Sequence, residues 1–209
     1  MPKLVYFPLG GRAEMIRFLL IHAKVQFEDI RLSFPEFGAA KGEGKYAEGL
    51  PVYISDDGHE MNQSNAILRA LGREHGYYGG STQETYEVDY IMENITDMGA
   101  PTFTVFMADE VTPEAIKTAV ETIDWYLGVF EKKLAGHGKT YLTGEKITIA
   151  DFALFAFISM SALNKGLKHA DVGEGVRNAI AHHPHLKAWS THLEGLFQEY
   201  LDARTPSWC

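Results

Sequence analysis

One stretch limits the possible folds more than any other. Residues 149–163 are apolar on nearly every side of a helix, and Asp151 is their only charge. Because a helix that is apolar all round must be buried on all sides, we expect this one at the centre of a helical domain. Thr148 and Asp151 have capping-box spacing, and Ile147 and Phe152 have the spacing of a hydrophobic staple. The pattern therefore predicts a structural role for Asp151.

Further helices are predicted through the second half of the chain. Apolar residues recur at helical spacing over residues 88–98, 116–134 and 186–200. Thr112-Pro113 adds a helix start, with threonine as N-cap and proline at the first helical position. This half is predicted to be all-helical.

The first third mixes strand and helix patterns. Strand formers at residues 3–7 precede a helical face over 12–24 and a second strand at 25–32. A strand–helix–strand unit implies a parallel crossover. Residues 51–55 and 58–62 predict a hairpin, which makes the sheet mixed. The segment between the second and third strands is expected to be irregular.

A glycine-rich connector separates the two halves. Residues 76–82 (GYYGGST) follow a predicted helix that begins near Gln63–Ser64, and they show no periodicity. We therefore predict two domains, an α/β domain over residues 1–77 and an all-α domain over residues 82–209.

Composition excludes several classes of protein. The 209 residues are 45% hydrophobic, which argues against a disordered chain. The single cysteine, Cys209, excludes an internal disulfide framework and a multi-thiolate metal site. A net charge of −9 disfavours a nucleic-acid partner or an anionic membrane surface. No stretch reaches the roughly 20 apolar residues of a membrane helix. We expect a soluble, cytoplasmic protein without a bound metal.

Three weaker motifs do not support a site. Residues 42–47 fit a dinucleotide-binding pattern but lack the required strand and helix on either side. Residues 138–140 lack the first glycine of a P-loop. The histidines around Pro184 are expected to be a solvated helix start; these are His182, His183 and His185.

Two features near predicted strand ends indicate a ligand site. Tyr6 ends the first strand before a glycine turn, where sheets with parallel crossovers bind ligands, although a core aromatic is the alternative. Pro51 begins the third strand. If the Leu50–Pro51 bond is cis, the backbone groups of Leu50 are available to a peptide-like ligand. Otherwise Pro51 is only a proline at a strand start.

The segment Gln63-Ser64-Asn65 is the third feature of this site. Backbone N–H groups, a hydroxyl and a carboxamide meet there at a helix start, which suits a carboxylate. The alternative is that Ser64 or Asn62 only caps the helix. Together with Tyr6 and Leu50, the segment predicts a pocket for a small peptide-like anion.

Four segments carry a resemblance to a known family. In order, they read YFPLGGRAE at Tyr6–Glu14, LPV at Leu50–Val52, QSNAIL at Gln63–Leu68 and ITIADF at Ile147–Phe152. With these the chain resembles the cytosolic glutathione transferases over essentially its whole length. The start is most similar to the tyrosine-type pi and sigma classes. The resemblance implies a thioredoxin-like N-terminal domain followed by an all-helical C-terminal domain.

The resemblance also implies an activity, the transfer of the co-substrate glutathione to hydrophobic electrophiles in a homodimer. Tyr6 would be the catalytic group facing the thiol, and Arg12 would raise the positive potential around it. The γ-glutamyl carboxylate would bind Gln63 and Ser64. The cysteinyl backbone would pair with Leu50, held by cis-Pro51.

The resemblance implies further roles for residues outside these motifs. Lys41, beside Phe37, would contact the glycine end of glutathione, with Lys45 as the rival. Gly49 would contribute a backbone contact, and Asp97 would reach the partner subunit's ligand. The acceptor pocket is expected to include Phe7, Leu9 and Met107.

Two alternatives to a transferase stay open at the level of sequence. One is a glutathione-dependent isomerase similar to the sigma-type prostaglandin synthases. The other is a non-enzymatic ligand-binding or structural protein on the same fold. The sequence does not specify the electrophile.

Overall fold

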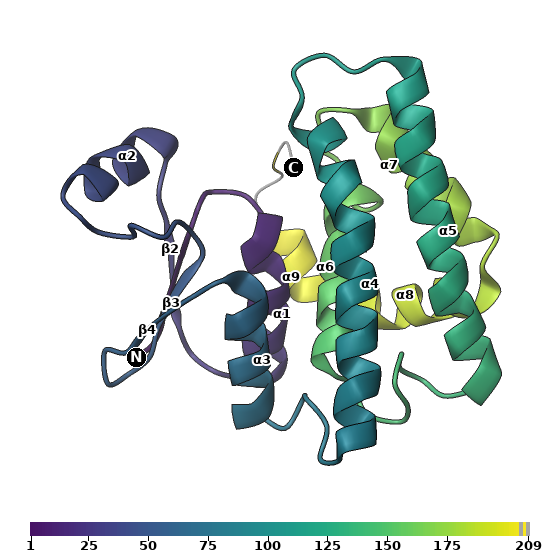
Figure 1. The fold of residues 1–209 in the computed structure, drawn as a ribbon, viewed down its shortest axis with the longest axis horizontal. Helices are drawn as coiled ribbons and strands as arrows, with labels where there is room; N and C mark the ends of the chain where they lie inside the picture. Colours follow the sequence, from purple (N-terminus) through teal and green to yellow (C-terminus); the bar gives the residue numbers. More distant parts are fainter. Residues whose placement is uncertain (205–206, 208–209) are drawn as a thin grey trace.

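The computed structural model describes residues 1–204 and 207. A small part built on a sheet lies beside a larger bundle of helices (Figure 1). The four strands of the sheet are β1 (Lys3–Tyr6), β2 (Glu28–Arg31), β3 (Val52–Ile54) and β4 (Glu60–Asn62). Their spatial order is β2-β1-β3-β4. β1 pairs in parallel with β2 and antiparallel with β3, and β3 pairs antiparallel with β4. The predicted crossover, hairpin and mixed sheet are therefore confirmed.

The segment after β2 is a helix, so the prediction of an irregular segment there was wrong. α2 (Phe34–Gly42) begins with a capping box. The Glu36 N–H donates to Ser33 Oγ at 3.4 Å, and the Ser33 N–H donates to Glu36 Oε2 at 2.7 Å. No residue of α2 is buried, which explains why the helix has no apolar periodicity.

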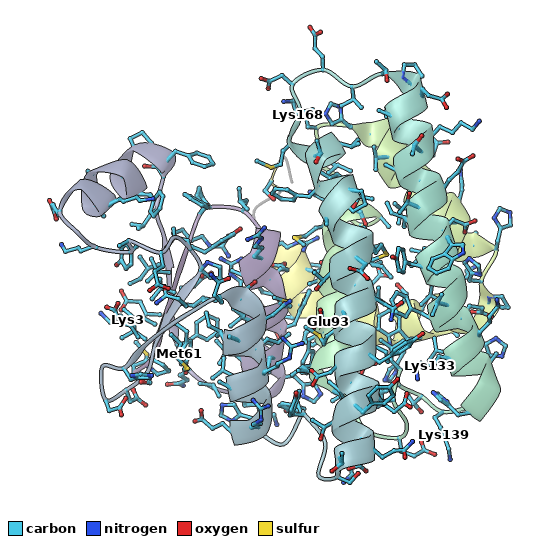
Figure 2. All side chains as sticks on the ribbon, in the orientation of Figure 1. Lys3, Met61, Glu93, Lys133, Lys139 and Lys168 are labelled. Carbon is cyan, nitrogen blue, oxygen red and sulfur yellow. The ribbon has the colours of Figure 1, made fainter. Side chains whose placement is uncertain are left out.

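Two helices of the small part face the bundle. α1 (Glu14–His22) and α3 (Ser64–Glu74) lie between the sheet and the bundle (Figure 1). Arg69 of α3 donates to Asp89 and Glu93 of the next helix, at 2.8 and 2.7 Å; Glu93 is labelled in Figure 2. This ion pairing holds α3 against the bundle, near the segment 75–81 that connects the two parts.

The bundle contains the remaining helices. Their bounds are α4 (Thr82–Met107), α5 (Pro113–His137), α6 (Ile149–Ser161), α7 (Ala170–Ala181), α8 (Pro184–Leu196) and α9 (Gln198–Ala203). Thr112 caps α5 as predicted, because its Oγ1 accepts from the Ala115 N–H at 3.2 Å. No helix within residues 1–204 is both long enough and apolar enough to cross a membrane.

α6 is the central helix that the sequence predicts. It packs against α1, α4 and α7, and all of its residues except Phe157 and Met160 are buried. Asp151 has no exposed surface and accepts from the Thr148 N–H at 2.8 Å, as the capping pair predicts. It also accepts from the Leu142 N–H and the Trp189 indole N–H, each at 2.9 Å. These two bonds join α6 to the loop before it and to α8.

We predict that Asp151→Ala lowers the free energy of unfolding by about 3 kcal/mol or more. The substitution leaves buried N–H donors without an acceptor, at about 1–3 kcal/mol each. The matched control is Asp171→Ala, which removes an exposed first-turn acid of α7. It should stay within about 0.5 kcal/mol of the parent. Urea unfolding of the three proteins measures the difference, and equal stabilities would contradict the assigned role.

Candidate functional site

Tyr6 lies at the carboxyl end of β1 with 7% of its surface exposed. Its hydroxyl oxygen accepts the backbone N–H of Arg12 at 3.1 Å. The chain reaches that position through Gly11, whose φ is +46°. A Cβ at Gly11 would lie 2.6 Å from Tyr6 Oη, so only glycine fits here. Accepting this bond polarises the hydroxyl and makes it a stronger donor.

A buried cation lies beside the same ring. The Arg17 guanidinium carbon is 6.0 Å from the Tyr6 ring centroid. Arg17 also donates to the carbonyl oxygens of Leu9 at 3.0 Å and Gly10 at 3.2 Å. Burial alone would lower the pKa of Arg17, but the carboxylates of Asp29 and Glu14 raise it above its ordinary value. A permanent positive charge therefore lies next to Tyr6 and fixes the loop that follows it.

The Leu50–Pro51 peptide bond is cis, as the sequence analysis considered. Pro51 is buried and leads directly into β3. Within residues 1–204 and 207, the N–H and C=O of Leu50 have no hydrogen-bond partner. Gly49 before them has φ +98°. The backbone N–H and C=O of Leu50 are therefore available to an incoming peptide.

The start of α3 is open. Gln63 precedes the helix with φ +69° and ψ 105°, an unusual conformation for a residue other than glycine. Among the described residues no side chain caps the helix, so the alternative role of Ser64 or Asn62 as a cap has no supporting hydrogen bond. Strained backbone of this kind is characteristic of ligand sites. The first N–H groups of α3, next to the Ser64 hydroxyl, suit a carboxylate.

A cavity of about 550 Å³ lies between the two parts of the molecule. The small part contributes the start of α1 and the start of α3, while α4 and α6 form the opposite wall. Most of the lining is apolar, and Arg12 is the only charged side chain among the described residues that line it. Its guanidinium carbon lies 5.8 Å from the Phe103 ring centroid. The lining includes Gly11, Arg12, Met15, Gln63, Ser64, Asn65, Ile95, Thr96, Phe103, Phe106, Phe157 and Met160.

Several residues singled out in the sequence lie outside this lining. Phe7, Leu9 and Met107 do not reach the cavity, and Tyr6 lies behind Gly11. Phe7 instead stacks on Phe34 of α2, with ring centroids 4.6 Å apart.

The two candidate lysines have different surroundings. Lys41 Nζ lies 5.9 Å from the Phe37 ring centroid, and that ring packs edge-on against Phe7 at 5.3 Å. Lys45 forms an exposed ion pair with Glu43 at 3.1 Å. Lys41 is therefore linked to the Tyr6 strand, whereas Lys45 already has an acidic partner.

Asp97 and the histidines around Pro184 are not among the residues that line the cavity. Asp97 is exposed on α4, next to the lining residue Thr96. His183 interacts with Asp124 at 3.0 Å, and His185 with Glu131 at 2.7 Å. Within the described part of the chain, no three His, Cys, Asp or Glu side chains gather as a metal site.

Sequence reasoning missed the helical wall of the cavity. Phe157 and Met160 of α6 belong to an apolar pattern that predicted only core packing, and Phe103 of α4 lies beyond the pattern recognised at residues 88–98. It also missed Arg17, which is charged but fully buried. The available signal for Arg17 was its place in an otherwise apolar run, from Ile16 to Leu20.

The comparisons with known proteins agree on one family. The family model described as "Glutathione S-transferase, C-terminal domain" matches residues 96–195. Glutathione S-transferase A of Cavia porcellus is 33% identical over 162 residues, covering 76% of this chain and 74% of that protein. Glutathione S-transferase alpha-4 of Rattus norvegicus is 30% identical over 202 residues, covering 93% and 84%. The crystal structure of the glutathione S-transferase from Ascaris lumbricoides has a TM-score of 0.84 at 28% identity, covering 100% of both chains.

We predict that Gly11→Ala is more destabilising than Gly76→Ala. Both glycines have positive φ, +46° and +80°, but an added Cβ would come within 3 Å of another atom only at Gly11. Both variants therefore strain the backbone, because alanine disfavours a positive φ. Only Gly11→Ala must also displace the rigid Tyr6 ring. The added cost should be about 1–3 kcal/mol in denaturant unfolding. Equal losses in the two variants would contradict the tight packing of Gly11 on Tyr6.

Proposed function

The chain belongs to the glutathione S-transferase family and transfers glutathione to electrophilic substrates, and we propose that Tyr6 is the catalytic group of this reaction. The observation that carries the proposal is the hydrogen bond from the Arg12 N–H to Tyr6 Oη, at 3.1 Å. It fixes the hydroxyl oxygen at the end of β1 as an acceptor, in an orientation from which the hydroxyl can donate its proton to a thiolate. Gly11, which packs on the Tyr6 hydroxyl, lines the cavity together with Gln63 and Ser64 at the start of α3.

The chemistry required of Tyr6 is stabilisation of a sulfur anion. A free thiol has a pKa of roughly 8.5, so it is mostly protonated at neutral pH. A hydrogen bond donated by the Tyr6 hydroxyl favours the thiolate and lowers the pKa of the thiol. The Arg12 side chain adds positive potential, since it carries the only charge among the described lining residues. The thiolate sulfur then attacks the electrophilic carbon of the acceptor.

The rest of glutathione fits the polar groups around Tyr6. We assign the γ-glutamyl carboxylate to Gln63 and the Ser64 N–H and hydroxyl, because this helix start has no side-chain cap among the described residues. We assign the cysteinyl backbone to the N–H and C=O of Leu50, held by Pro51 with Gly49 beside it.

Lys41 is our assignment for the glycine carboxylate. It is preferred to Lys45 because Lys45 is already paired with Glu43. Lys41 also belongs to α2, which rests on Phe7 directly after Tyr6.

The acceptor is assigned to the cavity between the two parts. Its walls from α4 and α6 are apolar, and they suit hydrophobic electrophiles. This division of roles supports the domains proposed from the sequence, with residues 1–77 binding glutathione and residues 82–209 forming most of the acceptor pocket.

The test of the catalytic assignment is Tyr6→Phe. The ring remains, so the variant should fold, with stability lowered by about 1–3 kcal/mol because the Arg12 N–H loses its acceptor. Glutathione binding should change little, because none of the groups assigned to its carboxylates and backbone is altered. Loss of a hydrogen bond to a charged group costs about 1.5–3 kcal/mol. At 1.36 kcal/mol per unit, the pKa of the bound thiol should rise by roughly one to two units. Conjugation of a chromogenic aryl halide should fall roughly tenfold to a hundredfold at neutral pH and partly recover as pH rises.

Thiolate absorbance followed against pH measures this shift directly. The matched control is Tyr53→Phe, which removes a hydroxyl from a buried tyrosine on the neighbouring strand β3. It should leave the titration unchanged. An unchanged curve and unchanged turnover in Tyr6→Phe would remove Tyr6 from the mechanism and leave the Arg12 side chain as the stabilising group.

We also propose that the chain forms a homodimer in which Asp97 reaches the ammonium of the partner's γ-glutamyl group. Asp97 is exposed on α4 and forms no ion pair within the described residues, which supports an intermolecular role. Sedimentation equilibrium at micromolar concentration should give twice the 23.3 kDa chain mass. Asp97→Asn should remain dimeric and raise the KM for glutathione by roughly two- to fivefold. A single 23.3 kDa species would exclude the dimer.

A further inference from the structure

A carboxylate with almost no exposed surface joins the two ends of the chain. Glu14, the first residue of α1, is 1% exposed. One of its oxygens accepts from Arg17 at 3.1 Å and from the Tyr200 hydroxyl at 3.0 Å. The other accepts from Arg204 at 2.8 Å. Tyr200 belongs to α9 and Arg204 follows it, so the end of the bundle is tied to the start of α1 (Figure 1).

Arg204 also holds the end of the central helix. It donates to the Ser159 carbonyl oxygen at 2.7 Å and to Ser159 Oγ at 3.2 Å. Asp29 and Arg31 of β2 are further charged groups here among the described residues, and Asp29 pairs with both Arg17 and Arg31. Burial, together with the neighbouring Glu14, raises the pKa of Tyr200, so its hydroxyl remains a donor.

The bonds continue from Glu14 to the thiolate centre. Arg17 Nη1 has two protons but lies within hydrogen-bond distance of three acceptors, the carbonyls of Leu9 and Gly10 and the carboxylate of Glu14. Those carbonyls belong to the loop that brings the Arg12 N–H onto Tyr6. The Glu14 carboxylate and the two loop carbonyls therefore compete for the protons of Arg17 Nη1.

We propose that Arg204 is a positioning residue for the thiolate centre, an inference that rests on the function proposed for Tyr6. By donating to Glu14, Arg204 satisfies the oxygen that Arg17 does not reach. Without Arg204, Glu14 draws more strongly on Arg17 Nη1, and the bonds from Arg17 to the Leu9 and Gly10 carbonyls weaken. The loop then holds the Arg12 N–H less firmly on Tyr6 Oη, and the hydroxyl becomes a poorer donor to the thiolate.

The central test is Arg204→Gln, compared with the parent by the pH titration of bound glutathione and by steady-state kinetics. The pKa of the bound thiol should rise by about half a unit to one unit. At pH 6.5, kcat should fall roughly three- to tenfold and recover at higher pH. The KM for glutathione should stay within about twofold, because Arg204 contacts none of the groups assigned to its binding.

Two further variants should raise the pKa of the bound thiol by smaller amounts. Arg204→Lys keeps the charge but loses the planar fork that reaches both Glu14 and Ser159, so its titration should lie between those of the parent and Arg204→Gln. Tyr200→Phe removes one hydrogen bond to Glu14 and keeps the ring that packs on Phe18, at 5.6 Å between centroids. It should shift the titration in the same direction by a smaller amount.

The matched control is Arg177→Gln. Arg177 also donates to a carbonyl at the end of α6, that of Ala162 at 2.9 Å, but within the described residues no bond links it to Glu14. Arg177→Gln should lower the stability of the protein without changing the pKa of the bound thiol.

The proposal would be overturned if Arg204→Gln lowers stability but leaves the pKa of the bound thiol equal to that of the parent. If Arg204→Gln does not fold, an unchanged curve in Tyr200→Phe would overturn it equally. The parent and Tyr6→Phe serve as references for the proposed function. A parent that forms no thiolate below about pH 8.5 would refute the role of Tyr6 itself, separately from the role of Arg204.

Discussion

The buried charge of Arg17 is the interaction on which the rest of the site depends. Taking a guanidinium out of water costs several kcal/mol unless partners surround it. Arg17 finds those partners in β2, in α1 and in the loop between β1 and α1. It is compensated only when all three are in place. The loop that carries Arg12 therefore has one favourable position. In that position the Arg12 N–H donates to the Tyr6 hydroxyl oxygen.

α6 connects this constraint to the bundle. Its buried residues form the core, and Asp151 ties its start to the preceding loop and to α8. Phe157 and Met160, the two residues that are not buried, line the cavity. Ser159, between them in the sequence, receives Arg204. One helix thus supports the fold, forms a wall of the cavity and holds Arg204.

The elements that could be predicted from the sequence are those specified by residues close together in the chain. The start of α6 and the hairpin of β3 and β4 follow from short motifs, and both were predicted. α2 was missed because it has no apolar face, although its signal, Ser33 with Glu36, is the same kind of capping pair recognised at Thr148. A search restricted to periodicity cannot find a helix that buries nothing.

Other parts of the site could not be predicted because they depend on distant contacts. Glu14 and Arg17 resemble surface charges on a helix, and only packing against β2 and α9 makes them buried. Phe103 and Phe157 have the spacing of core residues, and only the gap between the two parts of the molecule makes them a pocket wall. The short motif that begins at Gln63 predicted part of the polar lining of the cavity, whereas no motif predicted its apolar walls.

The two parts of the molecule meet opposite physical requirements. A thiolate needs donors and positive potential, which strand ends and helix starts provide through their backbone groups. A hydrophobic acceptor needs apolar walls, which helices in a bundle provide through their side chains. In the proposed function, substitutions at Ile95 or Phe106, which line the cavity, would therefore change the acceptor without disturbing Tyr6.

Met160 is the exception to this separation. It lines the cavity, and a Cβ placed on Gly10 would lie 2.8 Å from its sulfur, so it also rests on the loop that Arg17 holds. A larger side chain at position 160 would press on Gly10 and thereby on the hydrogen bond between Arg12 and Tyr6. In the proposed function, a substitution at this residue would therefore change both the acceptor pocket and the thiolate centre.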